Sequence, residues 1–255
     1  MDTKDLISIS LSILAFVLSG SATIISLFRA RQEKQRAIKR EITDTLGRIV
    51  ATALDSAKAY RETAQSDPNY FQAVSSILSQ QNTFLLNQAT YLAEQVPTLI
   101  TAVEYNTIAM ATANAGDLIA ADRYYKKAVD ASTNPYFRAL AMRSYANFLF
   151  SQHRFDEARK LFKQAVGLLA GTGDFVHFTN GFTYQMWAWN ELNLARAKGQ
   201  ADVYFEIAAN EFMAIENMPV RSDALMRLQL ARSGDPAGHP ANKPAFQPQA
   251  QANAA

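Results

Sequence analysis

Cysteine is absent from the 255 residues of the chain, and histidine occurs only three times. Without cysteine the chain can form no disulfide scaffold, no thiolate nucleophile and no cysteine-ligated zinc or iron–sulfur site. The histidines, His153, His177 and His239, are far apart in sequence and offer little for a metal site or a catalytic triad. The chain also lacks a phosphate-binding loop with its lysine, a dinucleotide-binding fingerprint and an H-E-x-x-H zinc motif. We therefore predict a protein that is not an enzyme and that uses no cofactor and no metal.

Positive charge is scarce outside one short segment. The net charge of the whole chain is +2, but residues 29–40 carry +5, whereas residues 1–28 carry −1 and residues 41–255 carry −2. No aromatic residue is interleaved with these bases, and the chain beyond them is slightly acidic, which argues against nucleic-acid binding. With 49% hydrophobic residues the chain is able to bury a sizeable core.

A run of 23 uncharged residues, 6–28, reads LISISLSILAFVLSGSATIISLF. At about 1.5 Å per residue, a helix needs roughly 20 such residues to cross the hydrocarbon layer of a membrane. A cleaved signal peptide and a buried core helix are the alternatives. The nearly neutral start MDTKD disfavours the first, and the basic RARQEKQR directly after the run disfavours the second. We predict that residues 1–28 form a single N-terminal transmembrane helix.

Six basic residues follow the predicted span: Arg29, Arg31, Lys34, Arg36, Lys39 and Arg40. Basic residues beside a span stay on the cytosolic side, so we expect a single-pass protein of an inner or plasma membrane with its C-terminal domain in the cytosol. The same six residues are placed to contact anionic lipid headgroups. An ordinary flank that stops membrane transfer has the same composition and is the alternative.

Small residues recur in the predicted span at spacings of four and three: Ser8, Ser12, Ala15, Ser19, Ala22 and Ser26. Small residues let helices approach closely in lipid, and a period of 3.5 residues is that of left-handed helix packing. This seam predicts association with another copy of the chain or with another membrane helix. A chance arrangement in a segment rich in serine and alanine is the alternative.

The rest of the chain predicts helices only. Residues 29–66 contain mostly good helix formers and develop an apolar face after residue 38, so we expect a basic and then amphipathic juxtamembrane helix. From residue 98 onward there is no alternating strand pattern, and helix pairs recur with a period in the mid-thirties. The predicted fold class is all-α, with a helical-repeat domain over residues 67–232.

Two stretches, 102–135 and 142–169, align on their inter-helix turns. Four pairs of residues match: Ala109 with Ala146, Ala121 with Ala158, Tyr125 with Phe162, and Ala128 with Ala165. The alanines let the two helices of a pair come close, and the aromatic residues fill the wedge between pairs. Gly116-Asp117 forms the sharp turn, with glycine in the left-handed C-cap position and aspartate capping the next helix.

These residues resemble the tetratricopeptide repeat, including its terminal Asn134-Pro135. The second unit, 139–169, has His153-Arg154 in place of the Gly-Asp turn and three extra residues, which we place in the loop between the pairs. A third unit at about 175–216 keeps Gly199 at a turn but has Tyr204 where a small residue is expected. Residues 67–96 would form an earlier pair of helices.

The resemblance implies a solenoid whose first helices line a concave, partner-binding groove. By this resemblance the groove-facing residues are Asn106, Met110, Arg143, Asn147, Phe150, Trp189 and Asn193. Asparagine can pair with both peptide donors and acceptors, and arginine can clamp a carboxylate. The alternative is that Arg143 and Asn147 are simply solvated surface residues.

We therefore expect a membrane-anchored scaffold whose cytosolic domain, which resembles the tetratricopeptide repeat, binds a protein or peptide partner. The alternative is a structural subunit of a membrane assembly that packs through its transmembrane helix. The predicted organisation is a span at 1–28, a juxtamembrane helix at 29–66, the repeat domain at 67–232 and a tail at 233–255. The tail contains four prolines and many small polar residues, so it is predicted to be disordered.

Overall fold

The computed structural model describes residues 3–63, 67–169 and 171–234. It describes the side chains of all of these residues except 3–24 and 63. Throughout this part of the chain every regular element is a helix, so the predicted all-α fold class is confirmed. The chain divides into two compact units, Met1–Ile100 and Thr101–Ala255. The predicted tail falls almost wholly on residues 235–255, outside the described residues.

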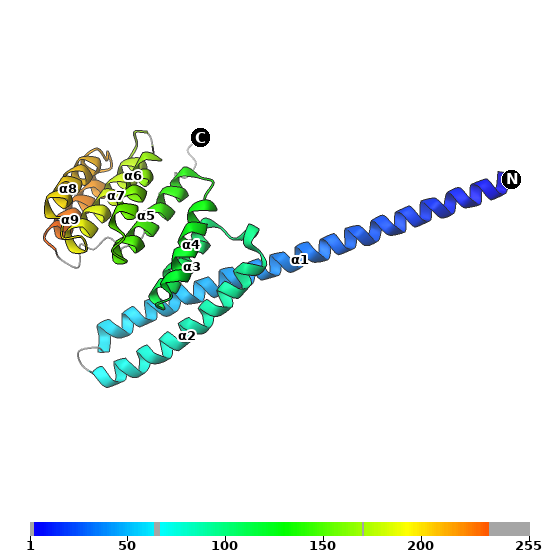
Figure 1. Cartoon of the computed structure of the whole chain (residues 1–255), viewed down its shortest axis with the longest axis horizontal. Coiled ribbons are helices and arrows are strands. Elements are labelled where there is room, and N and C mark those ends of the chain that lie inside the picture. The colour runs from blue at the N-terminus through cyan, green and yellow to red at the C-terminus, as the bar shows by residue number, and fades with distance from the viewer. Residues whose placement is uncertain (1–2, 64–66, 170, 235–255) are drawn as a thin grey trace. The chain divides into compact units, whose positions relative to one another are not determined.

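The first unit is a long helical hairpin (Figure 1). Helix α1 spans Thr3–Thr63 and helix α2 spans Pro68–Gln95, followed by a short 3-10 helix, η1, at Pro97–Leu99. The Asp67 carboxylate caps α2 by accepting a hydrogen bond of 3.0 Å from the Tyr70 amide, and proline suits the first helical position because its missing N–H would be unpaired there. The sequence signal at Asp67-Pro68 therefore marks a real helix start.

The two helices run antiparallel. Near one end the Gln88 side-chain amide donates to the Glu41 carboxylate at 2.8 Å, and near the other end the rings of Tyr60 and Phe71 are 5.6 Å apart. Buried side chains recur on each helix at spacings of three and four, the period of a two-helix seam. Those of the seam are Ile42, Thr45, Ile49 and Thr52 on α1, and Leu85, Ala89 and Leu92 on α2.

Residues 67–96 thus do not form the helix pair expected from the sequence. They form the single helix α2, one face of which packs against α1. The structural boundary between the two units accordingly lies after Ile100, and not near residue 66.

The predicted membrane segment lies in the N-terminal part of α1. Among the residues whose structure is described, no helix is both long and apolar enough to cross a bilayer. Most of residues 6–28 fall on positions whose side chains lie outside the described part. The span therefore remains a prediction from the sequence.

The second unit consists of three helical hairpins and a final helix, stacked in chain order (Figure 1). The hairpins are formed by α3 (Ala102–Asn114) with α4 (Leu118–Asp130), α5 (Pro135–Ser151) with α6 (Phe155–Gly167), and α7 (Asp174–Asn193) with α8 (Lys198–Met213). Helix α9 (Met218–Arg232) packs on α7 and α8. The first helices of successive hairpins, α3, α5 and α7, contact one another in that order.

Each hairpin has small and aromatic residues at matching buried positions. The matched residues of the first two hairpins are buried as expected, with Ala109, Ala146, Ala121 and Ala158 fully inaccessible. The third hairpin repeats the pattern with four buried residues: Ala188, Ala201, Phe205 and Ala208. Our expectation for this unit was wrong in its register. Gly199 lies in the first turn of α8, and Ala201 fills the position of Ala121 and Ala158.

Each of the three hairpin turns contains one residue with a positive φ. Gly116, His153 and Arg196 all adopt a positive φ, of 85°, 58° and 59°. Only glycine takes this left-handed conformation without a steric penalty on its Cβ. The second and third hairpins therefore close on a strained side-chain-bearing residue where the first uses glycine.

The three extra residues of the second unit lengthen a helix and not a loop. Helix α5 begins eleven residues before Ala146, whereas α3 begins seven residues before Ala109. The connection between α4 and α5 contains only residues 131–134.

The two helices of the third hairpin approach each other closely at Gly181. A Cβ placed on Gly181 of α7 would lie 2.5 Å from Cε1 of Phe212, the buried ring near the end of α8. Real Cβ atoms essentially never make such a contact, so the approach of α7 and α8 depends on glycine at this position.

Candidate functional site

Six of the seven residues predicted to bind a partner lie on the first helices of the hairpins at positions that are at least partly exposed. They are Asn106 and Met110 on α3, Arg143 and Asn147 on α5, and Trp189 and Asn193 on α7. We call these six residues the candidate surface. Met110 is the most open of them, with 49% of its surface exposed.

Phe150, the seventh predicted residue, does not belong to the candidate surface. It is fully buried, with its ring 5.9 Å from that of Phe162 and 5.6 Å from that of Phe155. Phe148 and Leu149 are buried as well, because the C-terminal end of α5 is enclosed where the chain turns into α6. The resemblance predicted a groove-facing position for Phe150, and the burial of this end of α5 contradicts it.

Arg143 has an environment that differs from those of the other half-buried arginines of the second hairpin. Its guanidinium lies 4.7 Å from the ring centre of Phe182 on α7, an arrangement in which the ring face attracts the cation. Within the described residues it forms no ion pair and no hydrogen bond. Burial lowers the pKa of Arg143 to about 10, so the side chain still carries its charge at neutral pH.

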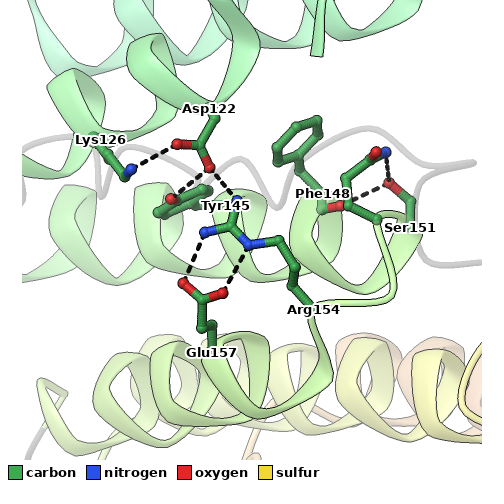
Figure 2. Close-up of polar contacts among 8 residues, drawn as sticks. Asp122, Lys126, Tyr145, Phe148, Ser151, Arg154 and Glu157 are labelled. Atoms are coloured by element: carbon green, nitrogen blue, oxygen red, sulfur yellow. Dashed lines mark hydrogen bonds and ion pairs between the residues drawn. The ribbon is translucent and has the colours of Figure 1, made fainter. Parts of the chain in front are cut away.

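Arg154 is satisfied by two carboxylates at the junction of the first and second hairpins (Figure 2). It donates to Asp122 at 2.6 Å and, through two nitrogens, to Glu157 at 2.7 Å each. The Tyr145 hydroxyl donates to the same Asp122 oxygen at 2.8 Å, and Lys126 lies 2.6 Å from the other oxygen. This network joins α4, α5 and α6.

The network lowers the pKa of Asp122. Burial acts in the opposite direction and raises it, but the hydrogen bonds from Lys126, Tyr145 and Arg154 together outweigh the burial. The pKa of Tyr145 is raised, first by burial and then by its hydrogen bond to Asp122. The network thus favours the charged form of the Asp122 carboxylate, which links α4 to α5 and to Arg154.

Arg159 is satisfied by a fully buried carboxylate. Its Nε and Nη2 each donate at 2.8 Å to Glu191 on α7, a side chain with no exposed surface. Trp187 Nε1 donates to the same carboxylate at 3.1 Å. A paired geometry of this kind supplies both charge and direction, and it joins α6 to α7.

The asparagines of the candidate surface are only partly satisfied. The Asn190 side-chain amide donates to Asn147 Oδ1 at 3.0 Å, which ties α7 to α5. Asn193 donates to the main-chain oxygen of Trp189 at 3.0 Å. The Oδ1 atom of Asn106 is buried and has no hydrogen-bond partner in the described structure, although a buried carbonyl oxygen normally has one.

Asn106 and Arg143 occupy equivalent places in their hairpins, three residues before the buried Ala109 and Ala146. The matching position in the third hairpin, three residues before Ala188, holds the buried Gln185. Sequence reasoning missed Gln185 and the ring of Phe182, because the third unit was aligned in the wrong register. Alignment on Ala201, Phe205 and Ala208 would have found both.

The two tryptophans have separate roles. Trp187 is buried, with its ring 3.9 Å from that of Tyr204 and 5.4 Å from that of Phe162. Trp189 is partly buried and packs against the core of the third hairpin. Of the two, only Trp189 keeps surface that a partner can reach.

The predicted seam and basic residues lie on α1. Of the seam, the side chains of Ser8, Ser12, Ala15, Ser19 and Ala22 fall outside the described residues, and Ser26 is exposed. The basic residues Arg29, Arg31, Lys34, Arg36 and Arg40 are exposed, whereas Lys39 is half-buried. Nothing in the described part of the chain gathers three histidine or acidic side chains into a group that could hold a metal ion.

Comparisons of this chain with protein-family models, with curated proteins and with solved structures found no match. The similarity to the tetratricopeptide repeat therefore rests on the repeated residues themselves.

Proposed function

We propose that the second unit is a protein-interaction domain similar to the tetratricopeptide repeat, and that its candidate surface binds a protein or peptide partner through an acidic group. One observation carries this proposal: Arg143 is half-buried on the layer of first helices and pairs with no carboxylate of the described chain. A partly desolvated cation without a counter-charge is costly, and an acidic partner would remove that cost.

The contrast with the neighbouring arginines supports the same proposal. Arg154 and Arg159, each about as exposed as the other, both have carboxylates at 2.6–2.8 Å. Among the described residues, carboxylates thus lie beside the arginines that join successive hairpins, and none lies beside Arg143. The unpartnered Oδ1 of Asn106, at the equivalent place on α3, adds a polar group that a peptide N–H can satisfy.

The test uses a photo-cross-linking amino acid in place of Met110 in the full chain, in the native cells. Arg143→Glu should abolish the cross-linked partner band, because it places a carboxylate where the partner's acidic group binds. Arg138→Glu is the matched control, since Arg138 is exposed on the same helix and the charge change is the same. Equal cross-linking in both variants would contradict the proposal.

We also propose that the chain is anchored in a membrane by residues 6–28. The support for this anchor is the uncharged run 6–28 followed by the basic segment 29–40, and the proposal places the second unit in the cytosol. Fusion of alkaline phosphatase or a fluorescent protein to the C-terminus tests it: fluorescence without phosphatase activity is expected, and the reverse result would overturn the orientation. If the full chain were recovered in the soluble fraction after a high-salt wash of membranes, the proposed anchor would be overturned.

The seam of small residues favours the second candidate, a structural subunit of a membrane assembly. Replacing residues 6–28 by an unrelated span of equal length separates the two. A scaffold keeps its cross-link at Met110, whereas an assembly subunit loses its complex and keeps no partner at that position.

A further inference from the structure

Four large hydrophobic side chains along helix α2 are exposed to solvent. The exposed fraction is 57% for Tyr70, 65% for Ile77, 68% for Phe84 and 68% for Tyr91. Each follows the previous one by seven residues, so they form one stripe along the helix. The stripe lies on a different face from Leu85, Ala89 and Leu92, which pack on α1. We call these four residues the α2 stripe.

The helix that carries the α2 stripe is almost free of charge. Residues 68–93 contain no aspartate, glutamate, lysine, arginine or histidine, and the first charged residue is Glu94. In a chain that is 19% charged, a segment of this length would carry about five charged residues. A helix face that remains in water normally has charged residues opposite its apolar side, so α2 has the composition of a helix covered on more than one side.

We propose that the α2 stripe is the contact between two copies of this chain, with their α2 helices side by side, parallel and in register. A strict seven-residue repeat keeps a stripe in contact with another helix over several turns, because the two helices then wind around each other with a left-handed twist. The occupant that matches this repeat is therefore a helix.

The absence of charge identifies which helix. A lipid surface is bound by helices with basic residues beside the apolar face, and α2 has none from 68 to 93. A partner helix with charges at its contact would leave them unpaired here. A second α2 presents the same uncharged face, so it brings neither repulsion nor an unpaired charge, as a two-fold interface requires.

The exposed area is sufficient for a weak but specific dimer. At about 200 Å² for each large side chain, the exposed fractions leave roughly 500 Å² of the stripe in water in each copy. Two copies together would remove about 1,000 Å² from water, which is near the lower limit of specific interfaces. The parallel arrangement rests on the proposed membrane anchor, because two copies anchored in one membrane run in the same direction.

The absence of cysteine makes the test direct, since a single introduced cysteine has no competitor. Ile77→Cys in the full chain should form an inter-chain disulfide on mild oxidation of isolated membranes, because facing positions of two packed helices satisfy the Cα separation of a disulfide. Ser79→Cys is the matched control: Ser79 is exposed on the same helix but points away from the stripe. Equal cross-linking at both positions would overturn the proposal.

A mass measurement tests the dimer independently of the anchor. The detergent-solubilised chain should have about twice its monomer mass of 28.2 kDa by light scattering. Phe84→Glu should weaken the dimer at least about tenfold, because two carboxylates would then face each other, while Ser79→Glu should not. A monomer at all concentrations, or equal weakening by Phe84→Glu and Ser79→Glu, would overturn the proposal. A dimer without a disulfide at 77 would overturn the parallel, in-register arrangement.

Discussion

Each of the two junctions between successive hairpins contains an arginine–carboxylate pair, but the carboxylates differ in burial. Between the first and second hairpins, Arg154 meets Asp122, whose side chain is 20% exposed. Between the second and third, Arg159 meets Glu191, which has no exposed surface. Both pairs are separated by 32 residues. Equal spacing therefore does not imply equal energetics, because water can replace a lost partner at the first junction and not at the second.

The largest predicted effect tests the buried junction. Arg159→Ala leaves the Glu191 carboxylate buried with Trp187 as its one remaining donor among the described residues, and should lower the free energy of unfolding by about 3–5 kcal/mol. Both tryptophans lie on α7, so tryptophan fluorescence during urea denaturation of the full chain reports on this unit. Lys160→Ala, at an exposed position next to it, should change little. A loss below about 1 kcal/mol would show that water reaches Glu191.

The next effect tests how closely the third hairpin is packed. Gly181→Ala places a methyl group against the Phe212 ring, and should cost about 1–3 kcal/mol in the free energy of unfolding. Gly199→Ala is the control, because no atom lies within 4 Å of a Cβ there, so the better helix propensity of alanine should leave stability equal or raised. Similar effects of the two substitutions would contradict the close approach of α7 and α8.

A smaller, pH-dependent effect tests the solvated junction. The folded chain holds the pKa of Asp122 below its ordinary value. Its stabilising contribution is therefore present above about pH 4 and is lost as the pH falls through the lowered pKa. Asp122→Asn should cost about 1 kcal/mol at pH 7, and its stability difference from the natural chain should shrink below about pH 4. Urea titrations at pH 7, 5 and 3 measure this, and a constant difference would contradict it.

A last effect, no larger than that of Asp122→Asn, concerns the turns of the first and second hairpins. His153→Gly relieves a positive φ of 58°, while Gly116→Ala introduces a Cβ at a φ of 85°. We expect Gly116→Ala to lower the melting temperature, at a cost of about 1 kcal/mol, and His153→Gly to leave it equal or raise it slightly, because glycine also gives the unfolded chain more freedom. A loss of stability for Gly116→Ala without a loss for His153→Gly is the expected result, and a destabilising His153→Gly would show that the side chain contributes.

Much of the fold follows from local signals in the sequence. The capping residues Asp67, Asp117 and Asn134 mark helix starts, and the alanine and aromatic pattern defines the first two hairpins. The third hairpin was placed out of register because its turn residue is Arg196 and not a glycine, so the nearest glycine, Gly199, misled the alignment.

Long-range pairings were harder to predict. The seam that joins α2 to α1 has a three-and-four spacing on both helices, which the sequence contains, but periodicity does not say which helix is the partner. For the candidate surface, the resemblance to the tetratricopeptide repeat predicted Asn106, Arg143 and Asn147 on the first helices, while the burial of Phe150 and the pairing of Arg159 with Glu191 depend on tertiary contacts.

The return of α2 along α1 determines where the chain leaves the first unit. Gln88 pairs with Glu41, so Gln95, seven residues further along α2, is level with about Lys34 in an antiparallel pair. The polypeptide therefore exits beside the basic segment, although α1 continues to Thr63, about 45 Å further at 1.5 Å per residue. The part of α1 that follows Lys34 therefore runs away from the exit point and returns as α2. Lengthening both helices at the end where they connect would not move the exit point.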